Sequence, residues 1–413
     1  MSNRRRLTPP PPLLRSLPSA PLTRRTLLRG VSAGALTAAG AGMLAACGTE
    51  GAQQSAESCR STDRSRTEKR LHFSNWPLYV DEARVNRNGE RQTIFPTLER
   101  FEKQTGIDVE YVTDVNDNAE FFGIVRNQLA ACESTGRDMF VLTDYMAARM
   151  IDLGWLQKLD KSNLPNVEAN LVENLKSPPW DPDREYAVHW QSGLTGIAYN
   201  AAETDEVRSF EELLTRPDLK GRISLLSEMP DTMLFMLLLV GADPEDFTDD
   251  EFGQATERLQ QAVDAGQIRA FTGNEYSQDL VRGNIAACEA WSGDVIQLQF
   301  ENPNIRFVAP EEGLSLWSDN MLVPNQATHK TNAETLMNYY YQPAVAAELA
   351  AWVNYICPVQ GAQEEMRKID PSLADNNLIF PDEQMLSNTY DFMALSQSKE
   401  QEYQRQFASV IGA

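Results

Sequence analysis

The stretch F-P-T-L-E-R-F-E-K-Q-T-G-I-D-V-E-Y-V-T, residues 95–113, holds a helix pattern followed at once by a strand pattern. Phe95, Leu98 and Phe101 recur at helical spacing, and Gly106 is typical of the residue that closes a helix. Residues 107–113 then alternate as a strand with one buried face does. A helix joined through glycine to a strand is the repeating unit of an α/β fold.

The same alternation continues along the chain. The further segments that read as strands are 71–75, 139–142, 195–199, 223–226, 285–291 and 305–308. Helical patterns separate them, and Asp117 with Glu120 and Ser209 with Glu212 are spaced as helix N-terminal caps. Strands separated by helices indicate parallel α/β sheets, and the chain length calls for two of them. In such sheets ligands bind beyond the carboxyl ends of the strands.

The first 46 residues read as an export signal and not as part of the fold. They contain seven Arg, including the pair Arg24 and Arg25, and no acidic residue. A small, apolar run follows over 30–46, too short and too rich in Gly and Ala for a stable membrane span. This arrangement predicts a twin-arginine signal peptide over residues 1–46.

The apolar run ends at L-A-A-C-G, residues 44–48, which resembles the lipobox of bacterial lipoproteins. The resemblance implies that Cys47 takes a lipid, which would hold the protein on the outer face of the cytoplasmic membrane without spanning it. Residues 47–69 are rich in Ser, Gln, Glu and Arg, so we expect a flexible tether there.

Charge restricts the partners. Removing the 46-residue leader leaves 367 residues, with 30 basic side chains against 59 acidic ones and a net charge of −29. A surface this acidic argues against nucleic acid, which is bound through basic patches. It favours a cationic ligand through long-range attraction, although solubility alone would also explain it.

Four further cysteines, Cys59, Cys132, Cys288 and Cys357, form no CxxC pair and no metal-ligand spacing. An oxidising compartment permits disulfides, but the spacing assigns no partners. Catalysis is not expected. The three histidines lie far apart without a nucleophile motif, and there is no GxGxxG, P-loop or clustered metal ligand, so neither an enzyme nor a cofactor is indicated.

Aromatic and acidic residues gather at the expected strand ends, with hardly a basic one among them. The clusters are N-W-P-L-Y (75–79), T-D-Y (143–145), S-E-M-P-D (227–231), W-S-G-D (291–294) and W-S-D (317–319). A linear polyamine needs this mixture, because its ammonium groups bind carboxylates and aromatic faces while its methylene chain packs on flat apolar walls. Any one of these residues could simply be a core aromatic or a helix cap.

From about residue 70 onward the chain resembles the spermidine/putrescine-binding periplasmic proteins that serve ABC transporters. The matching stretches, in the family's order, are F-S-N-W-P-L-Y-V (73–80), F-E-K-Q-T-G-I-D-V (101–109), T-D-Y (143–145), R-M-I-D-L-G-W-L-Q-K-L-D (149–160), W-S-G-D (291–294), L-W-S-D-N-M-L-V-P (316–324) and N-Y-I-C-P-V-Q-G-A (354–362).

The resemblance implies a two-lobed periplasmic-binding-protein fold (type II-like), with crossing strands and a ligand cleft between the lobes. We expect one lobe over 70–193 plus 319–360 and the other over 194–318 plus 361–413. The partners implied are a polyamine and ABC transporter permease subunits.

The resemblance also implies a set of ligand-binding residues. Asp294 and Asp319 match carboxylates that hold ammonium groups, and Glu228 and Asp231 keep the family's acidic pair. The full set is Trp76, Tyr79, Thr143, Tyr145, Glu228, Asp231, Trp291, Asp294, Trp317 and Asp319.

Other readings stay open at this point. The ligand could be another small cationic solute or ferric ion, and the protein could be a surface sensor or scaffold outside transport. Against iron, Tyr339, Tyr340 and Tyr341 fall on a predicted helix, where adjacent side chains point in different directions and cannot all meet one ion. The scaffold alone does not separate these functions.

Overall fold

The helix and strand of residues 95–113 form where their pattern predicts them. The computed structural model describes residues 59, 61–87, 90–393 and 395–412. Helix α1 (Pro96–Thr105) buries Leu98 and Phe101 and ends at Gly106, whose φ of 72° is left-handed. Strand β4 (Asp108–Thr113) follows and pairs in parallel with β1 (Arg70–Asn75). The twin-arginine pair, the signal peptide and Cys47 lie outside the described residues.

The remaining strands are β2 (Ala83–Arg87), β3 (Glu90–Ile94), β5 (Met139–Thr143), β6 (Ala187–Asn200), β7 (Ile223–Leu226), β8 (Ile268–Thr272), β9 (Ala287–Trp291), β10 (Ile305–Val308), β11 (Leu314–Leu322) and β12 (Thr389–Tyr390). The helices after α1 are α2 (Asn118–Ala130), α3 (Asp144–Asp152), α4 (Pro165–Asn170), α5 (Phe210–Thr215), α6 (Met229–Val240), α7 (Asp249–Asp264), α8 (Tyr276–Val281), α9 (Ser292–Glu301), α10 (Lys330–Tyr340), α11 (Pro343–Val353), α12 (Ala362–Ile369), α13 (Pro371–Ala374), α14 (Glu383–Leu386) and α15 (Gln397–Ile411).

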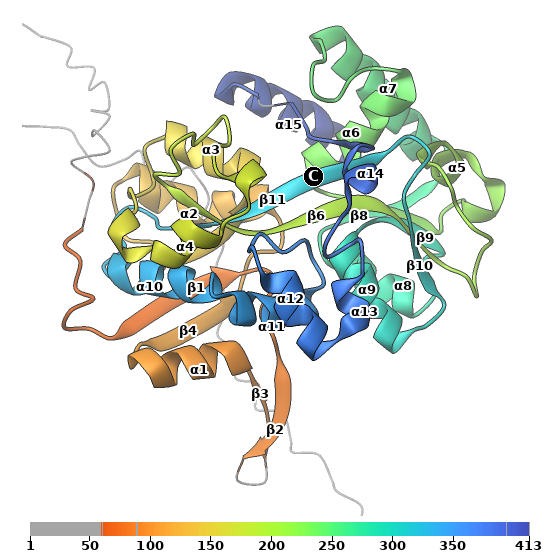
Figure 1. Ribbon diagram of the computed structural model, residues 1–413. Helices are drawn as coiled ribbons and strands as arrows, with labels where there is room; N and C mark the ends of the chain where they lie inside the picture. The colour runs from red at the N-terminus through yellow and green to blue at the C-terminus, as the bar shows by residue number, and fades with distance from the viewer. Residues whose placement is uncertain (1–58, 60, 88–89, 394, 413) are drawn as a thin grey trace, which may run out of the picture. The chain divides into compact units, whose positions relative to one another are not determined.

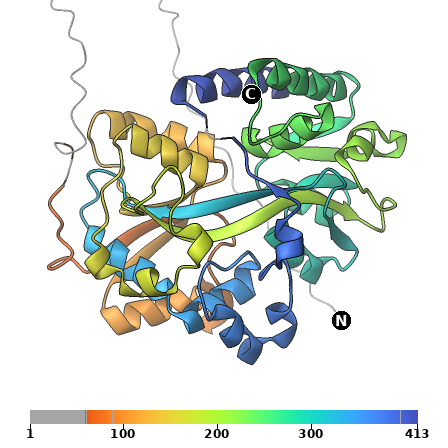
Figure 2. The same cartoon turned by 45° about the horizontal axis from the view of Figure 1, so that its top comes forward.

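The parallel strands belong to one continuous sheet, so the prediction of two separate sheets is wrong. The order is β4-β1-β5-β11-β6-β9-β7-β8, with β10 on β6 and β12 on β11. The long strands β6 and β11 pair antiparallel from Thr195 opposite Ser315 to Ala187 opposite Leu322. This pairing joins the parallel group β4-β1-β5 to the parallel group β9-β7-β8. Figures 1 and 2 show both strands crossing the middle of the fold.

Two hydrophobic cores pack around the sheet. The larger contains Phe73, Phe140 and Trp190, and the smaller contains Phe235 and Phe252, where α6 packs on β7 and on α7. Helix α15 joins the smaller core and runs beside α7 (Figures 1 and 2). The lobe boundaries expected from the sequence remain a prediction.

One packing fact bears on the last of those boundaries. Ala362 and Met366 of α12 are buried in the larger core, although the sequence assigns residues 361–413 to the second lobe.

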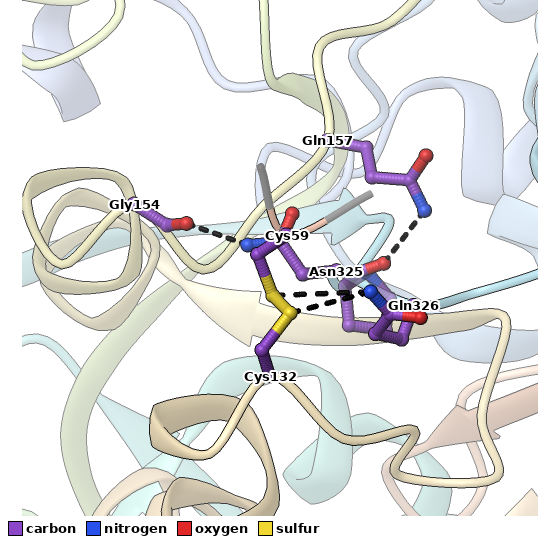
Figure 3. Close-up of a disulfide and its surroundings, with 7 residues drawn as sticks. Cys59, Cys132, Gly154, Gln157, Asn325 and Gln326 are labelled. Atoms are coloured by element: carbon purple, nitrogen blue, oxygen red, sulfur yellow. Dashed lines mark hydrogen bonds between the residues drawn. A yellow bond between two sulfur atoms is a disulfide. The ribbon is translucent and has the colours of Figure 1, made fainter. Parts of the chain in front are cut away.

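The end of the expected tether is attached to the fold. Cys59 forms a disulfide with Cys132, which follows α2 (Figure 3). The Arg64 backbone N–H donates to the Thr328 oxygen at 2.7 Å, and Ser65 is buried. Part of the segment expected as a tether thus has backbone partners in the fold and lies close in sequence to the covalent link at Cys59, which composition does not reveal.

The described residues contain no helix that is long and apolar enough to cross a membrane.

Candidate ligand-binding site

A cavity of about 710 Å³ opens where strands from both parallel groups end and where β11 crosses between them. Its lining includes all ten residues expected from the sequence: Trp76, Tyr79, Thr143, Tyr145, Glu228, Asp231, Trp291, Asp294, Trp317 and Asp319. The structure thus brings together residues that lie up to 243 positions apart in the chain. Their role in binding stays a prediction.

Asp319 lies in the middle of β11 and is almost fully buried. Its Oδ2 accepts a hydrogen bond from the Tyr79 hydroxyl at 2.8 Å, and its Oδ1 accepts one from the Thr143 hydroxyl at 2.8 Å. Burial outweighs both bonds and raises the pKa of Asp319 to about 7. The carboxyl group is therefore only partly ionised near neutral pH.

Asp294 stands in the first turn of α9, directly after β9. The Tyr355 hydroxyl donates to its Oδ1 and the Tyr276 hydroxyl to its Oδ2, each at 2.8 Å. Burial again raises the pKa, and the two tyrosine bonds oppose that shift.

Glu228 and Asp231 begin helix α6, after β7. Asp231 accepts a hydrogen bond from the Thr195 hydroxyl, and burial raises its pKa to about 6. Glu228 accepts from the Asn118 backbone N–H at 2.7 Å and from the Tyr145 hydroxyl at 2.6 Å. Both donors belong to the α2–α3 side of the cavity, so Glu228 joins its two sides. Burial, followed by the nearby Asp117, raises the pKa of Glu228 well above its usual value.

Aromatic rings form a continuous wall beside these carboxylates. Trp291 packs edge-on against Trp76 with centroids 6.2 Å apart and against Trp317 at 6.5 Å. Trp317 meets Tyr355 at 5.2 Å, and Tyr355 meets Tyr79 at 5.4 Å. The wall offers ring faces and edges, the groups that receive methylene chains and cations.

The cavity is short of positive charge. In the described part of the chain, no ion pair joins Glu228, Asp231, Asp294 or Asp319 to a Lys, Arg or His. Arg149 is the one cationic side chain among the lining residues that the structure describes. The described chain also contains no group of three or more His, Cys, Asp or Glu that could hold a metal ion. The arrangement suits a ligand that supplies several positive charges itself.

The comparisons with known proteins identify the family. A model described as "Bacterial extracellular solute-binding protein" matches residues 97–381. The chain belongs to this family of solute-binding proteins.

Two curated relatives come from Escherichia coli (strain K12). This solute-binding protein is 26% identical to a spermidine/putrescine-binding periplasmic protein over 340 residues, which cover 81% of this chain and 90% of the relative. It is 30% identical to a putrescine-binding periplasmic protein over 349 residues, which cover 79% of this chain and 83% of that relative. The family and these relatives are solute-binding proteins of transporters and not enzymes, as we expect from the sequence.

Solved structures confirm the two-lobed fold. A protein described as a spermidine/putrescine ABC transporter from Listeria monocytogenes aligns with a TM-score of 0.71 at 25% identity, over 83% of this chain and 99% of the other. The substrate-binding protein of a spermidine/putrescine ABC transporter from Streptococcus pneumoniae aligns with a TM-score of 0.65 at 22% identity. The alignment covers 83% of this chain and 98% of the other.

Several residues of the solute-binding protein's site were missed from the sequence. Tyr355 lies in N-Y-I-C-P-V-Q-G-A, one of the stretches that match the family, and this match could have indicated that it belongs to the site. Tyr276 and Asn118 sit at helix starts without such a motif, and only the folded chain shows that they donate to Asp294 and Glu228. Arg149 lies inside α3, away from the strand ends at which the sequence predicts the site.

Proposed function

We propose that this protein captures linear polyamines such as putrescine and spermidine outside the cytoplasm and delivers them to the permease of an ABC transporter. The observation that carries the proposal is the set of four carboxylates without an ion-pair partner in an aromatic-walled cavity. The printed names of the two Escherichia coli relatives support the same ligand class.

The physical reason lies in the cost of burying charge. A carboxylate removed from water is stabilised only when a counter-charge accompanies it, and hydroxyl donors do not supply one. An alkyl ammonium group would supply both the charge and hydrogen-bond donors. Several carboxylates along one aromatic wall match several ammonium groups along one methylene chain, with about 0.5–2 kcal/mol more from each cation–π contact.

Replacing Asp319 by Asn tests the proposal directly, because the change keeps the shape and removes one charge. We expect Asp319→Asn to weaken putrescine and spermidine binding by about 2–5 kcal/mol, the loss typical of one partner of a desolvated pair. Isothermal titration calorimetry measures the loss, and Asp294→Asn should act in the same direction.

The matched control is Asp250→Asn, the same chemical change on the exposed surface of α7. A surface charge contributes about 0–1 kcal/mol at most. Wild-type affinity for both polyamines in Asp319→Asn and Asp294→Asn alike would refute the polyamine assignment.

We also propose that the mature protein carries a lipid on Cys47 after removal of a twin-arginine signal peptide. The L-A-A-C-G sequence and the arginine-rich leader support this proposal. A lipid there would hold the protein on the outer face of the cytoplasmic membrane.

A further inference from the structure

The single cationic side chain in the described lining of the cavity is held by a partner from the C-terminal helix. The Arg149 guanidinium lies over the Phe122 ring at 4.0 Å and donates from Nη1 to Glu400 Oε1 at 3.0 Å. The two side chains retain only 13% and 7% of their exposure, so the ion pair is shielded from solvent.

The C-terminal helix positions Glu400 from the far side of the cavity. Glu400 stands in the first turn of α15, which begins after Ser396. Tyr403 of the same helix stacks on Phe252 of α7 at 3.8 Å. Arg149 instead comes from α3, so the pair joins elements 251 residues apart. Burial raises the pKa of Glu400, and the neighbouring guanidinium opposes that shift.

Arg149 keeps hydrogen-bonding capacity beyond this pair. Its Nε is buried and has no hydrogen-bond partner in the described chain. A guanidinium presents five N–H donors in a planar fork that matches a carboxylate. Without Glu400, the cavity would contain a desolvated cation with free donors, which is a binding site for a carboxylate on a solute.

We propose that Glu400 sets the charge specificity of the cavity: by pairing with Arg149 it prevents binding of solutes that carry a carboxylate. This inference rests on the proposed polyamine function. It concerns the difference between a diamine and the corresponding diamino acid, because putrescine and L-ornithine share their carbon chain and two amino groups and differ by one carboxylate. Rejection follows because an ornithine carboxylate meets the cavity's own carboxylates and a guanidinium that is already paired.

The test compares putrescine and L-ornithine by calorimetry in wild type and in Glu400→Gln. Wild type should bind putrescine and show little or no ornithine binding. Glu400→Gln removes the negative charge that compensates Arg149 and should raise ornithine affinity at least about tenfold, the change that 1.4 kcal/mol produces. The double variant Arg149→Gln/Glu400→Gln should lose that gain.

The matched control is Glu402→Gln, the same change two residues along α15, where Glu402 pairs with Lys399 on the surface. It should bind both ligands as wild type does. Arg149→Gln gives a second, independent measurement that does not depend on the stability of Glu400→Gln. With the carboxylate left unpaired, this variant should bind spermidine more tightly than wild type.

Two failures can be told apart. Polyamine binding in wild type with unchanged ornithine discrimination in Glu400→Gln, or with spermidine affinity not raised in Arg149→Gln, overturns the role of Glu400 alone. A wild-type protein that binds no polyamine overturns the proposed function, and the specificity role with it.

Discussion

Tyrosine hydroxyl groups donate to three of the four carboxylates that the sequence predicts as ligand-binding. Tyr79 donates to Asp319, Tyr145 to Glu228, and Tyr355 to Asp294. A neutral donor orients a carboxylate and satisfies its oxygens, but it leaves the net charge uncancelled. Desolvation therefore dominates and raises each pKa, whereas an arginine in the same place would have lowered it. The charge remains available for a ligand.

These raised pKa values predict that polyamine affinity increases with pH. Asp319 has its pKa raised to about 7 and Asp231 to about 6, and a bound ammonium group would lower both. Binding then releases protons, while the ligand's amines stay charged, as Lys does with its pKa of about 10.4. We expect putrescine to bind more tightly at about pH 8 than at about pH 5.5, with a smaller pH dependence in Asp319→Asn.

The same carboxylates lower the stability of the ligand-free protein as the pH rises, whereas they raise its affinity for polyamines. Their folded-state pKa lies above the unfolded value, so their contribution to stability is present at low pH and is lost as the pH rises through about 6 to 7. The gain in melting temperature on adding putrescine should therefore grow over this range. Equal dissociation constants for putrescine at about pH 5.5 and about pH 8 would contradict the assignment of these groups to the site.

Among the elements, β6 and β11 determine where the indole of Trp317 lies. Gly193 is the cross-strand partner of Trp317, and a Cβ on Gly193 would overlap the indole ring. The Trp317 Nε1 donates to the Thr195 hydroxyl at 3.0 Å, on the same stretch of β6. The absence of a side chain at Gly193 thus leaves room for the Trp317 indole to lie over the backbone of β6.

We expect Gly193→Ala to displace Trp317 and to lower both thermal stability and polyamine affinity. Overpacking of this kind costs about 1–3 kcal/mol of stability. Gly123→Ala is the control, because a Cβ on Gly123 meets nothing within 4 Å and alanine favours the helix by about 0.5–1 kcal/mol. Melting curves and calorimetry on both variants would decide, and unchanged putrescine binding in Gly193→Ala would show that the indole position does not matter.

The elements differ in how well the sequence predicts them. Strands β7 and β10 form at the predicted residues, because short apolar runs there are bounded by turns. The sequence does not predict the first half of β6, because A-V-H-W-Q-S-G-L (187–194) mixes polar and apolar residues without regular alternation, although all of them are buried. Continuous burial also hid the pairing of β6 with β11, which makes one sheet out of the two that were expected.

The candidate site was more predictable than its supporting residues. Acidic and aromatic clusters at strand ends can be recognised because topology brings the ends of parallel strands together. The donors Tyr276 and Asn118 depend on how α8 and α2 pack, which short-range patterns do not encode. The same holds for Cys59 and Cys132, whose proximity arises only once the chain has folded back.

At the scale of the whole molecule, the cavity takes its lining from both parallel groups of strands, which β6 and β11 join. We expect closure on the ligand by a hinge near Gln191–Leu194, Leu316–Asp319 and Pro358–Gly361. The Glu228 and Arg149 contacts described above already span the cavity and would stabilise the closed state. Small-angle X-ray scattering should show a smaller radius of gyration with saturating spermidine. An unchanged radius would count against hinge closure.

Membrane attachment gives a second prediction at this scale. Cys47→Ala removes the thiol that would take the lipid, so the variant should be released from the membrane fraction or keep its leader. Cell fractionation with mass spectrometry of the N-terminus tests this, with Cys357→Ala as a control because that buried thiol lies in the fold. Normal processing and membrane attachment of Cys47→Ala would disprove the anchor.

The Cys59–Cys132 disulfide would then set the length of the linker between the lipid anchor and the folded domain. Twelve residue steps separate Cys47 from Cys59, and at about 3.6 Å each they reach no further than about 43 Å. A lipid on Cys47 would confine the attachment point to a shallow layer above the membrane, at a local concentration on the order of millimolar. Loaded carriers would then reach a permease by lateral diffusion in two dimensions, so uptake would scale with their number per membrane area.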